Sequence, residues 1–132
     1  MSGPAILIVD DDRDEVKVAL RALERAGVSG PVEVASDGLE ALEALGLEAA
    51  NGAQAAAPRV VFLDLKMPRV DGWEVLRRMR EDERTARIPV VVLSSSDRPE
   101  DIERSYALGA NSFLQKRFDP RSPGAYIVDA AR

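Results

Sequence analysis

The sequence contains no cysteine and no histidine. Without cysteine the chain cannot form disulfides, use a thiol nucleophile or bind metal through thiolates. Without histidine it has no imidazole base or metal ligand, and it cannot carry phosphate on a histidine of its own. Its longest fully apolar runs are about five residues, too short to span a bilayer. No positive side chain precedes the run 5–9, so we expect no secretory signal and a cytoplasmic location without membrane contact.

An excess of basic side chains is also absent. The chain has 18 lysine and arginine residues against 23 aspartate and glutamate residues, which gives a net charge of −5. This balance argues against a nucleic-acid partner. The length of 132 residues suits one hydrophobic core. We therefore expect a single domain over residues 4–132, with no separate output domain.

Three unbroken apolar runs predict β-strands that are buried on both faces. They cover residues 5–9, 60–63 and 90–93. Two less apolar segments, 32–35 and 112–115, predict half-exposed strands. The segments between the strands have the apolar spacing of helices. We expect helices at about 13–26, 39–47, 72–82, 99–108 and 122–132.

Local patterns fix several details of these helices. Asp12 with Glu15 has the spacing of a capping box, which predicts that Asp12 caps the first helix. Trp73 lies beside the apolar face of the third helix, and we interpret it as a packing residue. Arg77, Arg78 and Arg80 are followed at once by acidic residues, so we interpret them as a solvated face of that helix.

Alternating strands and helices predict an α/β fold with a parallel sheet and right-handed crossovers. The three apolar strands belong in the centre and the two mixed strands at the edges. The doubly wound order 2-1-3-4-5 meets this requirement, in a three-layer flavodoxin-like sandwich. Its switch point lies between the first and third strands, where ligands of such sheets bind.

Distinct polar groups follow the ends of four predicted strands. The first strand ends in Asp10-Asp11-Asp12, the third at Asp64, the fourth at Ser94 and the fifth at Lys116. Crowded carboxylates repel one another, and Mg²⁺ favours such oxygen ligands together with phosphate oxygens. A metal bound by Asp11 and Asp64 would leave positions for a phosphoryl group. Lys116 would neutralise charge on that group, and Ser94 could donate a hydrogen bond to it.

At this point the sequence resembles the receiver domains of two-component response regulators. The matching positions are Asp10-Asp11, residues 63–72, Ser94, residues 109–111 and Lys116. The resemblance covers about residues 5–118. Residues 67–72 and 105–112 are most similar to single-domain receivers that partner phytochrome-like histidine kinases.

The resemblance implies a role for each matching residue. Asp64 would accept a phosphoryl group from a sensor histidine kinase or phosphotransfer protein. Asp10, Asp11 and Asp64, with the backbone carbonyl of Lys66, would arrange Mg²⁺. Ser94 and Lys116 would bind phosphoryl oxygens. These roles imply a signalling protein that catalyses only its own phosphorylation and dephosphorylation.

The resemblance also implies how the signal is read. Phe113 would be an aromatic switch residue coupled to Ser94. The two-state change would affect the face formed by the fourth helix, the fifth strand and the final helix. A downstream protein target would bind there, and the same face permits a homodimer without requiring one.

The sequence departs from the family at Arg117, where a proline after a cis peptide is usual. A cis bond before a non-proline residue costs roughly 2.5–4 kcal/mol. Either this bond is trans and the loop is rearranged, or strain is stored beside Lys116. We expect the trans form.

Two other functions compete with the receiver interpretation. In a haloacid-dehalogenase-type phosphatase, Asp10 would be the nucleophile and Asp12 the general acid of a D-x-D motif. Asp14 stands where that family has threonine or valine, and the chain is short for that fold. Alternatively, the chain is a receiver-like binding module that is never phosphorylated.

Overall fold

The computed structural model describes residues 6–28, 30–48, 57–67, 69–116, 124 and 127–128. Five parallel strands form one sheet in the order β2-β1-β3-β4-β5. They are β1 (Ile6–Val9), β2 (Val32–Ala35), β3 (Val60–Asp64), β4 (Val90–Ser94) and β5 (Ser112–Gln115). The predicted fold class and strand order are confirmed.

Burial follows the predicted difference between central and edge strands. Every residue of β1 and β4 is buried, whereas β5 is half-buried along its length and β2 is mostly accessible. In the register, β1 lies between β2 and β3, so that Val9 is level with Ala35 on one side and Leu63 on the other. The residues that follow β1 and β3 therefore emerge side by side.

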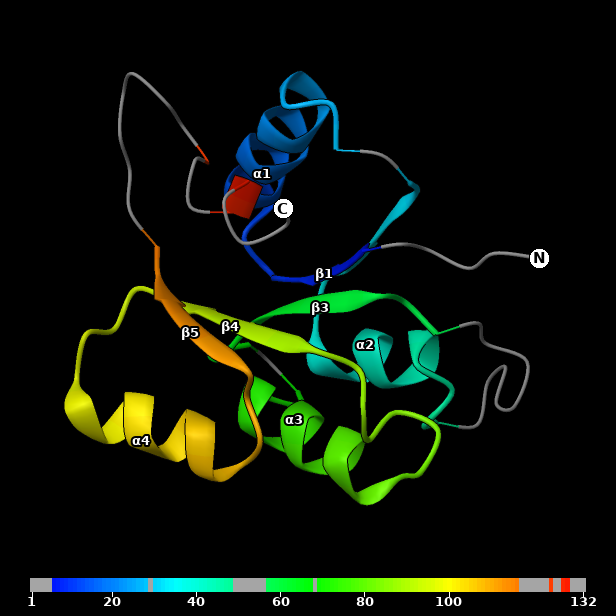
Figure 1. Cartoon of the computed structure of the whole chain (residues 1–132), viewed down its shortest axis with the longest axis vertical. Helices are drawn as coiled ribbons and strands as arrows, with labels where there is room; N and C mark the ends of the chain where they lie inside the picture. Colours follow the sequence, from blue (N-terminus) through cyan, green and yellow to red (C-terminus); the bar gives the residue numbers. More distant parts are fainter. Residues whose placement is uncertain are drawn as a thin grey trace.

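Helices cover both faces of the sheet. They are α1 (Arg13–Arg25), α2 (Gly38–Ala44), α3 (Gly72–Glu81) and α4 (Pro99–Ala107). Figure 1 shows α1 on one face and α2, α3 and α4 on the other, which makes three layers. No described helix is long and apolar enough to cross a membrane. Most of the expected helix 122–132 lies outside the described residues, although 127–128 are helical and lie on the α1 side.

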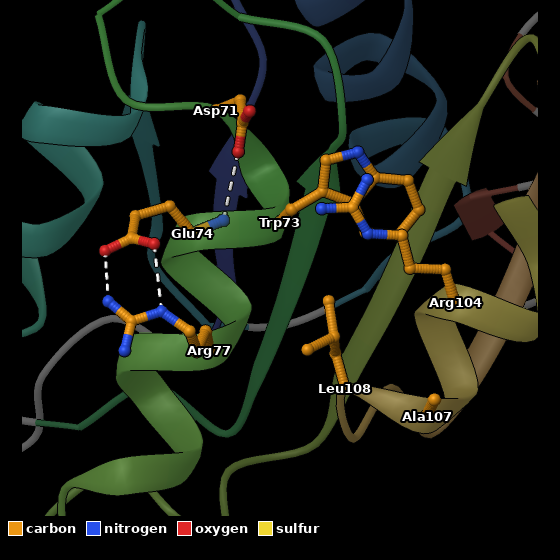
Figure 2. Close-up of a pocket in the computed structure, with 7 residues that line it drawn as sticks. All are labelled: Asp71, Trp73, Glu74, Arg77, Arg104, Ala107 and Leu108. Carbon is orange, nitrogen blue, oxygen red and sulfur yellow. Dashed lines mark hydrogen bonds and ion pairs between the residues drawn. The ribbon is translucent and has the colours of Figure 1, made fainter.

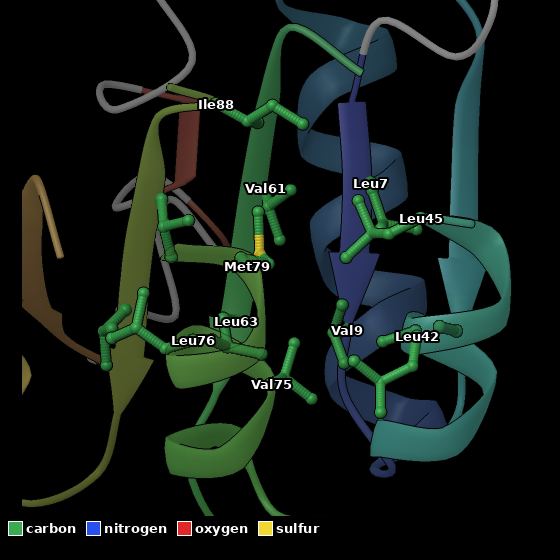
Figure 3. Packing of buried hydrophobic residues seen from close by; sticks show 14 of the residues in the cluster. Leu7, Val9, Leu42, Leu45, Val61, Leu63, Val75, Leu76, Met79 and Ile88 are labelled. Carbon is green, nitrogen blue, oxygen red and sulfur yellow. The ribbon is translucent and has the colours of Figure 1, made fainter. Parts of the chain in front are cut away.

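Each face of the sheet has its own hydrophobic cluster. On one face, Leu42 of α2 and Val75, Leu76 and Met79 of α3 pack against the strands (Figure 3). The predicted core face of α3 is thus confirmed. On the other face, α1 packs against alternate strand residues, and Ile127 is completely buried in that cluster.

Asp12 caps α1 as predicted, because its carboxylate accepts hydrogen bonds from the backbone N–H groups of Asp14 and Glu15. The second hydrogen bond of a capping box, from the N–H of Asp12 to the Glu15 carboxylate, does not form. The N–H of Asp12 donates instead to Asp10 Oδ1 at 2.9 Å, and the Glu15 carboxylate turns toward Lys116. A charged partner attracts this carboxylate more strongly than a neutral N–H group at an exposed helix end.

The prediction that the arginines of α3 form a solvated face is right for Arg77 and wrong for Arg80. Arg78 is half-buried and donates to the carbonyl of Leu47 and to Glu48, so it is only partly solvated. Arg77 is exposed and pairs with Glu74 and Glu81 on the same helix. The guanidinium of Arg80 is turned inward, donating to four backbone carbonyls and to the side chain of Asn111. Its carbonyl acceptors belong to Thr85, Ala86, Ile88 and Gly109. Arg80 therefore joins the loop between α3 and β4 to the loop between α4 and β5.

Candidate phosphoryl-acceptor site

The acidic residues after β1 and at the end of β3 converge at the switch point of the sheet. Carboxylate oxygens of Asp10, Asp11 and Asp64 all lie within 4.8 Å of one another. Asp10 is buried, Asp64 is partly buried and Asp11 is exposed. The convergence predicted from the strand ends is therefore present, with one side open to solvent.

The start of α3 packs directly behind Asp64. The N–H of Gly72 donates to the carbonyl of Leu65 at 2.9 Å. A Cβ atom at position 72 would lie 2.2 Å from the backbone oxygen of Asp64, so only glycine allows this close approach. Asp71 caps α3 by accepting from the N–H of Glu74. Asp64 thus stands between a rigid central strand and a capped helix.

Lys116 reaches the same point from the end of β5. Its backbone N–H donates to the carbonyl of Ser94 at 2.8 Å, which places it beside the end of β4. Its Nζ lies 3.0 Å from Asp10 Oδ2, 2.5 Å from Glu15 Oε2 and 3.6 Å from Asp64 Oδ2. Glu15 was not predicted to belong here. The Lys116–Arg117 peptide lies outside the described residues, because Arg117 is not among them.

Burial and charge shift the titration of this group of side chains. The pKa of Asp64 is raised to about 7, mainly by burial and further by the charges of Asp10, Asp11 and Glu15, although the charge of Lys116 opposes the shift. Burial likewise raises the pKa of Glu15. Burial alone would lower the pKa of Lys116, but its hydrogen bond to Glu15 and the charges of Asp64 and Asp10 outweigh this and raise it. Among the described residues, the carboxylates of this site outnumber its one ammonium group, that of Lys116.

The donor set fits a hard divalent cation. The carboxylates of Asp10, Asp11 and Asp64 can each offer one oxygen atom to the same ion. Among the described residues, the other charged groups in contact with them are Lys116 and, through Lys116, Glu15. Oxygen-only donors suit Mg²⁺ or Mn²⁺ and are unsuited to a thiophilic metal. Lys66 lies in the exposed loop after β3, where the family resemblance places a carbonyl ligand.

Ser94 ends β4 and is buried. Its Oγ accepts a hydrogen bond from the N–H of Ser96 at 3.0 Å, and the Ser96 hydroxyl donates to Asp101 of α4 at 2.7 Å. Ser94 is therefore joined to the first turn of α4 through Ser96. Among the described residues, the Ser94 hydroxyl donates to no acceptor, so its proton can be donated to a ligand.

Phe113 is half-buried on β5 and packs against the cluster on the α2–α4 face. Its backbone N–H donates to the hydroxyl of Tyr106, an exposed residue of α4, at 3.2 Å. Phe113 thus lies where β5 and α4 meet. Most of the final helix is outside the described residues, so the predicted binding and homodimer face stays a prediction.

A pocket of about 340 Å³ lies between α3 and α4, and the carboxylates that converge near Asp64 are not part of its lining (Figure 2). The guanidinium of Arg104 covers the ring of Trp73, 4.3 Å from its centroid. Glu74 accepts from Arg77 on the same wall. The Trp73 ring is thus covered by a side chain of the protein itself, which agrees with its predicted packing role.

A doubly wound sheet with acidic residues at its switch point and a lysine from the last strand defines the receiver class of signalling domains. Residues 6–125 match the model of the response regulator receiver domain, and the chain belongs to that family. This assignment disfavours the haloacid-dehalogenase alternative, and Asp12, its proposed general acid, is engaged as a helix cap.

Curated relatives and solved structures agree with this assignment. The chain is 42% identical to the probable methanogenesis regulatory protein FilR2 of Methanothrix harundinacea, over 84% of this chain and 70% of that protein. It is 32% identical to the response regulator Rcp1 of Synechocystis, over 84% of this chain and 75% of that protein. It spans only 44% of the longer DNA-binding regulator RpaA of Synechocystis.

Two crystal structures match nearly the whole chain. One is the phosphorylated cyanobacterial phytochrome response regulator RcpA, with a TM-score of 0.87 at 32% identity, covering 98% of this chain and 91% of that one. The other is the Mn²⁺-bound form of Rcp1, with a TM-score of 0.85 at 28% identity, covering 96% of this chain and 90% of that one. The predicted similarity to phytochrome-associated receivers is confirmed.

Proposed function

We propose that this chain is a single-domain response regulator in which Asp64 accepts a phosphoryl group. The observation that carries the proposal is the position of Asp64, which lies 3.6 Å from Lys116 Nζ and within 4.8 Å of the carboxylate oxygens of Asp10 and Asp11. The donor would be a phosphohistidine on a phytochrome-like histidine kinase or on a phosphotransfer protein. The relatives named above support this class of partner.

In the proposed reaction a carboxylate oxygen of Asp64 forms a bond to phosphorus. The bond from phosphorus to the histidine nitrogen of the donor breaks, and its electron pair stays on that nitrogen. Bound Mg²⁺ would favour the ionised form of Asp64 and offset charge on the phosphoryl oxygens. Lys116 would pair with one phosphoryl oxygen, and the Ser94 hydroxyl would donate to another.

The signal would leave through α4 and β5. Ser94 contacts α4 through Ser96 and Asp101, and Phe113 contacts Tyr106. A phosphoryl group that draws the Ser94 hydroxyl toward it would disturb the first of these links, and Phe113 would respond as the switch residue. The output would then be contact with a downstream protein, in the cytoplasm.

The proposed metal site predicts that Mg²⁺ binding depends strongly on Asp11. We expect Asp11→Asn to weaken Mg²⁺ binding about tenfold or more, because it removes a charged oxygen ligand. Asp11 is exposed, so the fold should tolerate the change. Mg²⁺ titration by calorimetry measures the effect. Asp14→Asn is the control, since it removes an equal charge from the nearby first turn of α1; equal losses in both variants would contradict the assignment.

The proposed acceptor is tested by mapping the modified residue. After incubation with acetyl phosphate and Mg²⁺, trapping of the aspartyl phosphate and peptide mass spectrometry should place the modification on Asp64, and Asp64→Asn should remove it. Modification of Asp10 would instead support phosphatase-like chemistry. An unmodified wild-type protein would favour the binding module that is never phosphorylated.

A further inference from the structure

Lys116 is hydrogen-bonded to two carboxylates, and neither of them belongs to Asp64. A lysine ammonium group has three N–H donors. One contacts Glu15 Oε2 at 2.5 Å and another Asp10 Oδ2 at 3.0 Å. Asp64 Oδ2 is at 3.6 Å, which is ion-pair distance but beyond a hydrogen bond. The ammonium group thus lies on the α1 side of the site.

Glu15 is the partner that this position depends on most. It comes from α1, 101 residues before Lys116, and its contact is the shortest that Lys116 makes. The side chain of Lys116 is only 11% exposed, whereas that of Glu15 is 40% exposed. The Glu15 carboxylate therefore reaches in from the surface toward an almost buried cation. It has no part in capping α1, since Asp12 provides that cap.

We propose that Glu15 is a positioning residue that holds Lys116 away from Asp64 and competes with the incoming phosphoryl group for this lysine. The inference rests on the proposed function of Asp64. Pairing of Lys116 with a phosphoryl oxygen on Asp64 draws its Nζ, now 3.6 Å from Asp64 Oδ2, toward Asp64 and away from its 2.5 Å contact with Glu15. The negative charge of Glu15 also opposes the arrival of an anionic donor.

This competition affects phosphorylation and hydrolysis differently. Phosphorylation starts from the state in which Glu15 holds Lys116, so the transition state must overcome this contact. Hydrolysis starts from the phosphorylated state, in which Lys116 has already left Glu15. We expect Glu15→Gln to raise the rate of phosphorylation by a small phosphodonor about three- to tenfold, the range for a partly exposed charged hydrogen bond. The hydrolysis rate should change less than about twofold on the same reasoning.

The experiment compares three variants with wild type at fixed Mg²⁺ and acetyl phosphate. Glu15→Gln should accelerate phosphorylation. Glu15→Asp, which keeps the charge but shortens its reach, should accelerate it less. Asp14→Asn, the matched loss of one charge in the same exposed turn, should leave the rate unchanged. Decay of the phosphorylated protein after removal of the donor gives the hydrolysis rate.

A second measurement needs neither metal nor donor. In Mg²⁺-free protein, ¹⁵N NMR of the Lys116 ammonium group should show faster proton exchange in Glu15→Gln than in wild type or Asp14→Asn. Equal phosphorylation rates and equal exchange in Glu15→Gln and Asp14→Asn would overturn the inference while leaving Asp64 as the acceptor. Failure of wild type to be modified on Asp64 would instead overturn the proposed function.

Discussion

Asp64→Asn is expected to stabilise the metal-free protein at pH 8, raising the free energy of unfolding by about 2 kcal/mol. Asp10, Glu15 and Asp64 lie around the ammonium of Lys116, and Asp11 adds a further carboxylate beside Asp10 and Asp64. Burial and this crowding raise the pKa of Asp64 to about 7. Asparagine keeps the shape of the side chain and removes the charge that the folded state tolerates poorly.

The sign of the pH dependence follows from the two pKa values. In the unfolded chain Asp64 titrates near its ordinary value of 3.8, and in the folded protein near 7. Between these values the folded state binds more protons than the unfolded state, so wild-type stability falls as pH rises. A shift of about three units sets an upper limit of about 4 kcal/mol, and the lost ion pair with Lys116 reduces the net gain. The advantage of Asp64→Asn should therefore vanish near pH 4.

Chemical denaturation with EDTA present, at several values between pH 4 and pH 8, measures this difference. Asp14→Asn serves as the control, because its carboxylate is exposed and should change stability by less than about 0.5 kcal/mol at any of these pH values. If Asp64→Asn were no more stable than wild type at pH 8, crowding of charge would not be the dominant property of the site.

Arg80→Ala is expected to destabilise the protein by about 3 kcal/mol, whereas Arg77→Ala should change the stability far less, because its ion pairs are exposed to solvent. The two arginines lie on the same helix and carry the same charge. Arg80 donates to carbonyls in the α3–β4 loop and the α4–β5 loop, and to Asn111 Oδ1, which itself accepts from the N–H of Val90. Arg77 makes only exposed pairs with glutamates of its own helix.

Guanidinium chloride unfolding of the two variants tests this difference at a single pH. The midpoint should fall much further for Arg80→Ala, with an unchanged slope if both states keep their compactness. Arg80→Lys should recover part of the loss, because one ammonium cannot reach all the acceptors of a guanidinium. Equal midpoints for the two alanine variants would mean that water replaces the Arg80 hydrogen bonds at no net cost.

The architecture could be predicted from sequence because its determinants are local. Unbroken apolar runs are required of strands buried on both faces, and the mixed composition of 32–35 and 112–115 assigned these strands to the edges. Once the order was known, parallel geometry brought Asp64 and Lys116 to the same end of the sheet. The site therefore followed from topology more than from any single motif.

The parts that could not be predicted depend on contacts between distant segments. The local pattern around Glu15 favours a capping box, but its side chain binds Lys116, 101 residues away. The acidic residues after Arg80 suggest a solvated arginine, but the acceptors lie in loops that only the folded chain brings near. In both cases a long side chain can reach several partners, and local spacing does not say which one is closest in space.

The burial of Ile127 has a consequence for the order in which the protein can assemble during synthesis. The core on the α2–α4 face is built from buried residues between positions 7 and 110, whereas the core on the α1 face packs Ile127 with Ile6 and Ile8. Closing that face therefore needs a residue 17 positions later in the chain than the last buried residue of the other face, Ala110. During synthesis on a ribosome, the α2–α4 face can therefore pack first. The α1 face is completed only after residue 127 has left the ribosome.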